Sequence, residues 1–448
     1  MTEHVLRPVL REIKVAHSLS GAMAALEGAR FDVVIVRVEA ERVRSAQEID
    51  VTDITRMIDD GRKLGGRQDW LLMALVDQPD SMLQTMLDDA GFDDIVCEPV
   101  HPMQLASRVS TLLRLATMWR ELLRRQRTAR LFTANSPAAS DVNLELERPG
   151  LHPGPRAHPS ILAFDMTGGG RRALRVHLHH HATVSWATAE DDALGALFTS
   201  NVDACLLLAS DDFDAALRFA ETVRHSVSLF NLPLLIMARA MTHQQMDRAF
   251  KAGVTDVIIG DDFPQDFQYR FASHVRLERL RGTLVHAYER AANSASRDSV
   301  SGVYTHGFAM AHLDQAIADS RALNHPLTVA LCRIDNMDEI NRRFGYHAGD
   351  HVLGQVGVVL RQALRGEDLA ARLTGREFML IFPDTPDSRA RLALGRVLSI
   401  LRFSPLALPE QAQGGLHLRV SSACLGRGQE ESARELLRAL SSRRRVAA

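Results

Sequence analysis

The chain has 448 residues, of which 46% are hydrophobic and 24% charged, and its net charge is −2. A chain of this length is expected to form about three domains, since a single core stops growing well below it. The near-zero net charge provides no basic field to hold nucleic acid, so that function class is excluded. No segment has about 18 consecutive apolar residues, and the four cysteines lie far apart in apolar runs, as reduced core thiols do. We therefore expect a cytoplasmic protein that does not span a membrane.

Residues 1–133 alternate short apolar strands with amphipathic helices. Strands are predicted at KVAHS, FDVVIV, WLLMALV and IVCEP, with helices between them and after the last. Strands that are apolar throughout and separated by helices are typical of a parallel sheet covered on both faces. The basic run RELLRRQRTAR at 120–130 continues the last helix, and we interpret it as a solvated helix face.

The rest of the chain divides into a linker, a second α/β domain and a third domain. Residues 134–158 are rich in Pro, Gly, Ser and His, which predicts a linker. Residues 159–282 repeat the α/β pattern with the strands ILAFD, ATVSWA, VDACLLL, LPLLIMA and TDVIIG. A connecting helix and linker are predicted over 283–297, and the third domain over 298–448.

The first two domains resemble two-component receiver domains, which have the doubly wound, flavodoxin-like α/β fold. The resemblance is clearest in AGFDDIVCEPVHP at 90–102 and AGVTDVIIGDDFP at 252–264, the last helix-to-strand step of a receiver. The alternative is a pair of unrelated doubly wound domains, since that fold recurs often. A receiver also needs an opening strand before Lys14, where thirteen residues stand. Either the first domain lacks that strand, or the start of the sequence is misplaced.

Receiver chemistry requires an acidic pair for Mg²⁺, an aspartate that accepts the phosphoryl group, a lysine and a hydroxyl side chain. The acceptor, lysine and hydroxyl positions hold other residues: Arg37, Glu98 and Val76 in the first domain, and Leu208, Gly260 and Ala238 in the second. Of the acidic pair, Asp165 remains in the second domain. We therefore expect both domains to serve in docking rather than signal reception, with a homodimer formed through them.

Residues 298–448 resemble the GGDEF domains of diguanylate cyclases, which have an α+β fold of the nucleotidyl-cyclase type. Four segments carry the resemblance in the family's order: DSVSGVYTHGF, RIDNMDEINRRFGYHAGDHVLGQVG, ARLTGREFMLIFP and LRVSSACLG. In that family, the resemblance implies, two carboxylates hold Mg²⁺ against GTP while two nucleotides are joined.

The metal-binding positions of this domain have changed. They hold Arg333 and Arg376, and a guanidinium group has no acceptor lone pair for a cation. Thr374 replaces the first glycine of the signature, and Ser441, in a looser match, replaces a lysine that contacts phosphate. We therefore predict no catalytic residue, no bound metal and no cyclase activity.

Two ligand sites of the family keep their residues. Asn341 and Asp350 stand at the guanine-contacting positions and form a possible vestigial guanine site, although both residues also suit turns. Arg365 and Asp368 have the spacing of the RxxD product-inhibition site, and Arg396 matches its second arginine. An arginine can bond a phosphate or a guanine edge bidentately, and a carboxylate can accept from guanine N–H groups. The alternative is a solvated turn with a weak surface ion pair.

We therefore interpret the protein as a non-catalytic receptor for cyclic-di-GMP. Two alternatives stay open: a weak or partner-dependent diguanylate cyclase, and a scaffold that uses no nucleotide. The domain order resembles that of response regulators with two receivers and a GGDEF domain, and the altered catalytic positions resemble their non-catalytic members. This resemblance implies a role in the cell cycle, localisation at a cell pole, and delivery of the regulator CtrA to the protease ClpXP through RcdA.

Overall fold

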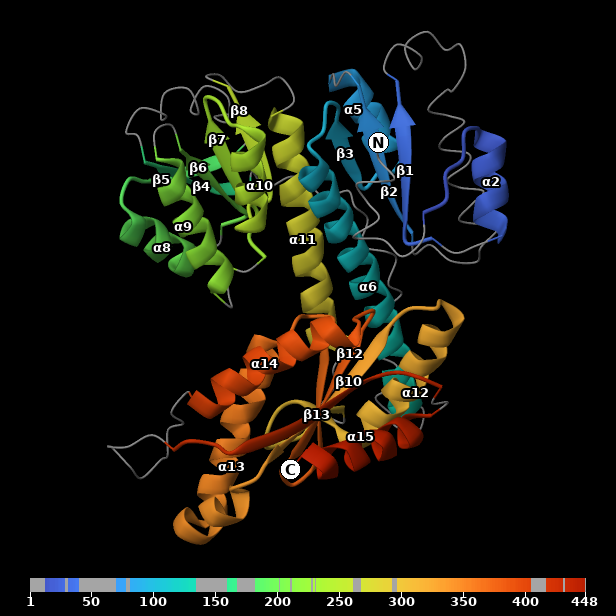
Figure 1. Cartoon of the computed structure of the whole chain (residues 1–448), viewed down its shortest axis with the longest axis vertical. Helices are drawn as coiled ribbons and strands as arrows, with labels where there is room; N and C mark the ends of the chain where they lie inside the picture. Colours follow the sequence, from blue (N-terminus) through green and yellow to red (C-terminus); the bar gives the residue numbers. More distant parts are fainter. Residues whose placement is uncertain are drawn as a thin grey trace. The chain divides into compact units, whose positions relative to one another are not determined.

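A computed structural model describes fourteen stretches of the chain (Figure 1). They are residues 13–28, 31–39, 70–77, 81–133, 159–166, 182–200, 202–209, 212–226, 229, 231–260, 267–291, 296–403, 416–429 and 432–447. Within these stretches, no helix is both long enough and apolar enough to cross a membrane.

The chain forms two compact units whose limits differ from the predicted domains. Unit 1 comprises residues 1–116 and 146–283, and unit 2 comprises residues 117–145 and 284–448. The predicted linker 134–158 and the segment before residue 13, where an opening strand was sought, lie outside the described residues. The predicted domain limits therefore stay a prediction, but two long helices contribute residues to both units: α6 (Pro102–Thr133) and α11 (Phe267–Ala291).

The amino-terminal part of unit 1 contains a parallel sheet in the order β1-β2-β3. Its strands are β1 (Val33–Val38), β2 (Leu71–Val76) and β3 (Asp94–Cys97), and the helices beside them are α2 (Leu19–Gly28), α5 (Ser81–Asp89) and α6. The strand predicted at KVAHS is wrong, because residues 13–16 have no regular structure. Val15 there is 58% exposed, so this segment has no apolar face to bury in a sheet.

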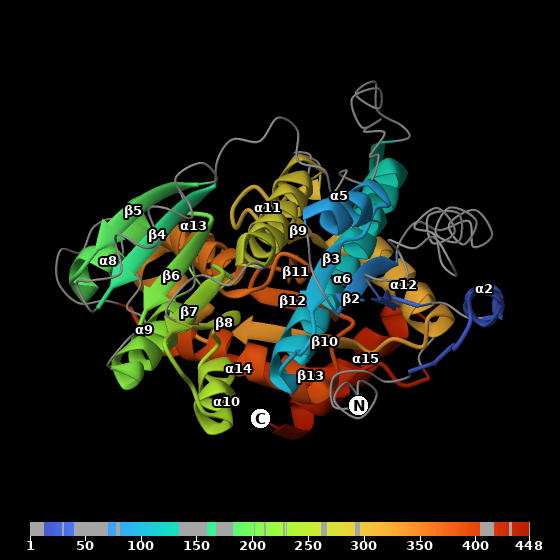
Figure 2. The ribbon, with the colours of Figure 1, turned by 90° about the horizontal axis from the view of Figure 1, so that it is seen from above.

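The second part of unit 1 is a five-stranded parallel sheet in the order β5-β4-β6-β7-β8. Its strands are β4 (Ser160–Asp165), β5 (Thr183–Ala187), β6 (Ala204–Leu208), β7 (Leu234–Ala238) and β8 (Asp256–Ile259). Helices α8 (Glu190–Thr199), α9 (Phe213–His225) and α10 (His243–Lys251) cover one face, and α11 covers the other (Figure 2). This strand order is that of the flavodoxin-like doubly wound fold, while the receiver assignment of both domains stays a prediction.

A chain of buried charged groups joins the two sheets of unit 1. Arg108 on α6 donates from Nε to Asp94 at the start of β3, at 2.8 Å. Its Nη1 lies 2.6 Å from a ring nitrogen of His274 on α11, and His274 lies 3.1 Å from Asp256 at the start of β8. All four side chains are buried, so each charge is stabilised by its neighbours rather than by water.

Unit 2 contains a mixed sheet in the order β13-β10-β12-β11-β9. The strands are β9 (Tyr304–Thr305), β10 (Leu327–Ile334), β11 (Leu369–Thr374), β12 (Glu377–Pro383) and β13 (Val420–Gly426). The helices are α12 (His306–Ala322), α13 (Met337–Ala363), α14 (Asp387–Phe403) and α15 (Ala433–Ala447).

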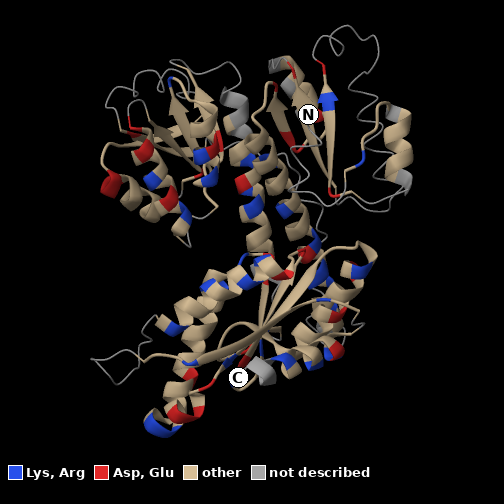
Figure 3. Ribbon diagram, viewed as in Figure 1, with Lys and Arg blue, Asp and Glu red and all other residues tan. Residues whose placement is uncertain are grey.

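Alternation along β10 builds a core on each face of this sheet. Ala330 and Cys332 pack with α13 and α14, whereas Val329 and Leu331 pack with α12 and α15. Figure 1 shows these two pairs of helices on opposite sides of the strands, and Figure 3 shows that most of the ribbon of these strands belongs to uncharged residues. Ala129 of α6 belongs to the same core as α12, so the end of α6 is part of unit 2.

The basic run 120–130 is therefore not a solvated helix face, and that interpretation is wrong. Glu121, Arg124, Arg125 and Thr128 are all buried. Charged side chains leave water only when each finds a partner, and the partners here lie far along the sequence in α12 and before β11.

Candidate functional site

The two arginines at the predicted metal-binding positions lie next to each other in unit 2. Arg333 is near the end of β10 and pairs in register with Glu377 of β12. Arg376 lies in the turn between β11 and β12, and its carbonyl accepts a hydrogen bond of 3.0 Å from the N–H of Ile334. The fold thus brings these two positions together, as the motif resemblance implied.

Nearby carboxylates neutralise both arginines. Arg333 Nε donates to Asp335 Oδ1 at 2.8 Å, and Ser421 Oγ donates to the same oxygen at 2.9 Å. Arg376 forms an ion pair with Asp338 of α13. A divalent cation does not fit these residues, since Asp335 and Asp338 are engaged by guanidinium groups and two positive charges would repel the ion. Among the described residues, no group of three or more potential ligands could hold a metal.

The predicted guanine-contacting residues are close together across an interruption of α13. Gly345 has φ of +83°, a conformation that favours glycine, and it separates the turn containing Asn341 from the turn containing Asp350. A methyl group built on Gly349 would lie 2.0 Å from Asn341 Oδ1. That oxygen is buried and has no hydrogen-bond partner among the described residues, whereas Asp350 is exposed.

Arg365 and Asp368 close a tight turn between α13 and β11. The Asp368 N–H donates to the Arg365 carbonyl at 3.1 Å, and the Arg365 N–H donates to Asp368 Oδ2 at 3.0 Å. Asp368 is 8% exposed, and the bond that its carboxylate accepts from the Arg365 N–H orders the main chain of the turn. The Arg365 side chain is exposed, and within the described part of the chain its guanidinium has no hydrogen-bond or ion-pair partner.

Arg396 reaches the same turn from α14. Its guanidinium donates to the carbonyl of Ala363, the last residue of α13 and two positions before Arg365. The end of a helix carries partial negative charge, which stabilises a cation there. The three residues predicted to bind ligand therefore surround one end of α13.

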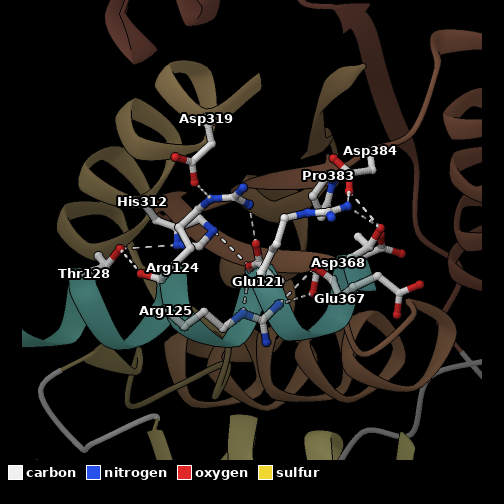
Figure 4. A network of polar contacts seen from close by, with 12 residues as sticks. Glu121, Arg124, Arg125, Thr128, His312, Asp319, Glu367, Asp368, Pro383 and Asp384 are labelled. Atoms are coloured by element: carbon white, nitrogen blue, oxygen red, sulfur yellow. Dashed lines mark hydrogen bonds and ion pairs between the residues drawn. The ribbon is translucent and has the colours of Figure 1, made fainter. Parts of the chain in front are cut away.

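The other side of this turn contacts α6, as Figure 4 shows. Arg125 donates from Nη2 to the carbonyls of Glu367 and Asp368, at 3.2 and 2.9 Å. Its Nε donates to Glu121 Oε1 at 2.9 Å, and its guanidinium carbon lies 4.4 Å from the ring centre of Tyr288 on α11. Arg125 is 4% exposed, so this guanidinium is enclosed by partners.

Glu121 is the carboxylate at the centre of the contact. Arg124 donates to it at 2.6 Å, and His312 Nε2 lies 3.0 Å from it. Burial by itself would raise the pKa of Glu121, but His312, Arg125 and Arg124 together lower it to about 2. Burial also lowers the pKa of His312. Arg124 continues the network by donating to Asp319 of α12 at 3.0 Å.

A second polar cluster anchors the preceding turn of α6. Arg120 and Thr117 donate to Asp384 Oδ2 at 2.5 and 2.7 Å, and His325 lies 3.1 Å from the other oxygen. Burial opposes ionisation of Asp384, but the bond to His325 and the charge of Arg120 hold its pKa well below the usual range. Sequence analysis missed both clusters. The available signal was Glu121 three and four residues before two arginines, a spacing that pairs charges on a helix.

In unit 1 the predicted acceptor position forms an ion pair with the predicted lysine position. Arg37 donates to Glu98 Oε2 at 2.9 Å, and Glu98 raises the pKa of Arg37. In the second sheet, Asp165 and Leu208 lie opposite each other at the ends of β4 and β6. The positions where receiver chemistry is expected thus lie at the carboxyl ends of parallel strands, without an acceptor aspartate at Arg37 or Leu208.

Comparison with known proteins shows which proteins the carboxy-terminal part of the chain resembles. Residues 295–443 match the family described as diguanylate cyclase, GGDEF domain. This part of the chain is similar to GGDEF domains. The chain is also similar to the response regulator PleD of Caulobacter vibrioides, with 25% identity over 327 residues that cover 71% of this chain and 68% of PleD. The diguanylate cyclase TpbB of Pseudomonas aeruginosa is 30% identical over 177 residues, 39% of each chain.

Solved structures of GGDEF proteins were also found. The GGDEF domain of DgcB from Caulobacter crescentus, in complex with c-di-GMP, is 22% identical and covers 35% of this chain and 89% of that one, with a TM-score of 0.33. Diguanylate cyclase SiaD from Pseudomonas aeruginosa, in complex with its activator SiaC, is 21% identical and covers 39% of this chain and 66% of that one, also with a TM-score of 0.33. By sequence, the chain is related to the response regulator PleD over 71% of its length, and residues 295–443 are related to diguanylate cyclases.

From the lowered pKa of Glu121 we predict how the stability of the fold changes with pH. Its folded value of about 2 lies below the ordinary 4.5, so this carboxylate stabilises the fold above pH 4.5 and loses that effect between pH 4.5 and 2. The shift corresponds to about 3 kcal/mol. We expect Glu121→Gln to lower the free energy of unfolding at pH 7 by about this amount, with the difference from the natural protein shrinking below pH 4.5.

Urea unfolding at several pH values, followed by circular dichroism, measures this difference. Glu339→Gln is the control, since Glu339 forms an exposed ion pair with Arg419 in the same unit, and exposed pairs contribute about 0–1 kcal/mol. A Glu121→Gln effect that stays constant from pH 7 to pH 3 would contradict the role assigned to the buried carboxylate.

Proposed function

We propose that the protein is a non-catalytic receptor for cyclic-di-GMP, bound at Arg365, Asp368 and Arg396. The observation that carries this proposal is the exposed Arg365 guanidinium, which has no partner within the described residues and stands on a turn ordered by Asp368. A charged fork on an ordered turn can bond a phosphate or a guanine edge bidentately.

The chemistry of the turn suits a cyclic dinucleotide. Arg365 can bond a phosphate oxygen or the O6 and N7 atoms of guanine, and its flat guanidinium can stack on a base. Arg396 adds a second positive charge beside the same helix end. Loss of an acceptor carboxylate at Arg333 and Arg376, together with retention of the ligand residues, favours binding over turnover.

The remaining function would lie in protein contacts. With its altered catalytic positions the chain resembles PopA, a non-catalytic relative of PleD, and this likeness supports an adaptor role in regulated proteolysis at a cell pole with RcdA, ClpXP and CtrA. In this proposal the receiver-like domains form the homodimer and present partner surfaces, because Arg37 and Leu208 replace the acceptors.

Two other functions would give different results. A weak or partner-dependent cyclase would need a metal site, which the ion pairs of Arg333 and Arg376 oppose. A nucleotide-independent scaffold would leave the Arg365 turn without a ligand, whereas a guanidinium with no partner among the described residues favours the receptor instead.

The receptor proposal predicts that Arg365→Ala abolishes binding of cyclic-di-GMP. Each charged hydrogen bond that is lost should cost about 1.5–3 kcal/mol, which is roughly tenfold or more in affinity. Isothermal titration calorimetry measures this loss of affinity. Arg389→Ala is the matched control, since Arg389 is an exposed arginine on α14. Equal affinities of the Arg365→Ala variant and the natural protein would refute the proposed site.

The altered metal positions predict that no cyclase product forms from GTP with Mg²⁺ or Mn²⁺. Arg333→Asp combined with Arg376→Glu is expected to remain inactive, because Thr374 and Ser441 also differ from the family. Product analysis by liquid chromatography is the measurement, with an active cyclase such as TpbB as the positive control. Turnover by the natural protein would establish the enzyme alternative.

The receiver-like domains should dimerise without responding to phosphorylation. Sedimentation velocity is expected to show a dimer whose proportion is unchanged by acetyl phosphate with Mg²⁺, and intact-mass spectrometry should show no added phosphoryl group. A phosphorylated species, or a monomer at all concentrations, would contradict the docking role.

A further inference from the structure

The turn that carries Arg365 is held on its inner side by a residue that lies far earlier in the sequence. Arg125 of α6 donates to the carbonyls of both Glu367 and Asp368, the two residues that lead into β11. These residues are 3% and 8% exposed, so water does not readily replace the donor. The orientation of both peptide groups therefore depends on where Arg125 lies.

Arg125 itself is fixed by the helices around it. Glu121, one helical turn earlier, accepts from its Nε, and the rings of Tyr288 and Tyr304 lie 4.4 and 5.7 Å from its guanidinium carbon. The Tyr288 hydroxyl donates to the carbonyl of Met118 on α6, which joins α11 to α6 at the same level. A displacement of either helix would therefore move the group that holds the turn.

Gly366, inside the turn, contacts the same two helices. A methyl group built on this glycine would lie 3.2 Å from Val285 and 3.4 Å from Tyr288, both on α11, and 3.5 Å from Met118 on α6. The turn thus has α6 and α11 on one side and the exposed Arg365 on the other. Movement of the turn toward the helices is blocked, and movement away from them would break the bonds from Arg125.

We propose that Arg125 is a positioning residue for the cyclic-di-GMP site, and that the seating of α6 and α11 against the turn sets the affinity for the dinucleotide. This inference rests on the proposed function and adds its regulation. Arg125 lies behind the turn and does not touch the ligand. It orders the peptides between Arg365 and Asp368, so that the guanidinium and the carboxylate are already placed when the ligand arrives.

The coupling acts in both directions. If correct seating of α6 raises the affinity for the ligand, then bound ligand must stabilise the seating of α6 by the same factor. Both helices also contribute residues to unit 1, from Pro102 in α6 and from Phe267 in α11. Ligand bound at the turn would therefore also stabilise the position of the helices that continue into the receiver-like domains.

The test compares two variants with two controls in the full-length chain. Arg125→Met removes the donor but keeps a long side chain, and Gly366→Ala places a methyl group 3.2 Å from Val285 of α11, closer than ordinary contact. Arg127→Met changes an exposed arginine of the same helix, and Gly395→Ala adds a methyl group to α14 where nothing lies within 4 Å. Calorimetry measures the affinity for cyclic-di-GMP, and hydrogen–deuterium exchange follows residues 364–369 and 120–130.

We expect Arg125→Met to weaken binding about tenfold or more and Gly366→Ala to weaken it severalfold, with both controls within about twofold. In the natural protein the ligand should slow exchange in residues 120–130, and this effect should be lost in Arg125→Met. Ligand-dependent protection of α6 is the readout that a merely stabilising arginine would not change. Natural affinity together with natural exchange in Arg125→Met would overturn the inference.

Failure of the proposed function can be told apart from failure of this inference. If the natural protein does not bind cyclic-di-GMP, the receptor function is refuted, and exchange of residues 364–369 without ligand decides the role of Arg125. Faster exchange there in Arg125→Met, without a change in the rest of unit 2, would uphold the positioning role, and unchanged exchange would refute it. If Arg125→Met does not fold, Gly366→Ala decides by the same measurements.

Discussion

The buried charge of Glu121 constrains much of unit 2. A carboxylate removed from water loses several kcal/mol of hydration, which only close and well-oriented partners can offset. Arg124 and Arg125 supply two of them from the same helix, and His312 supplies a third from α12. Once these arginines are buried, their remaining N–H groups need acceptors too, and they find Asp319 and the carbonyls before β11. One buried acid thereby fixes α6 against both α12 and the Arg365 turn.

At two predicted functional positions, an arginine forms an ion pair with a nearby carboxylate. At a predicted metal position in unit 2, Arg376 pairs with Asp338, and at a predicted acceptor position in unit 1, Arg37 pairs with Glu98. These pairs are partly exposed and contribute little to stability. Their effect is on chemistry, because a guanidinium held by a carboxylate neither binds Mg²⁺ nor accepts a phosphoryl group. The turn of Arg365 differs, since this arginine has no such carboxylate among the described residues.

Motif spacing predicted which residues of the candidate site lie close together in the fold, and long-range contacts could not be read from it. The RxxD spacing implies a turn, and Arg365 and Asp368 do close one by main-chain bonds. The neighbouring positions of Arg333 and Arg376 followed from the family's hairpin. The docking of α6 was missed because Arg124 and Asp319 are 195 residues apart. A basic helical run looks solvated when its acceptors are not visible, so the pattern of residues 120–130 was misinterpreted.

The KVAHS segment shows that a local pattern can also predict a strand that does not form. A short run with apolar residues satisfies the local pattern of a strand, but a strand persists only where a neighbour supplies hydrogen bonds and a core accepts its side chains. FDVVIV has both, since β1 pairs with β2 along its whole length and Val38 is buried. Val15 is exposed, with no comparable surface to pack against in the described part of the chain. Local sequence therefore states which structures a segment can adopt, and the tertiary partners decide among them, for this strand as for the charged face of α6.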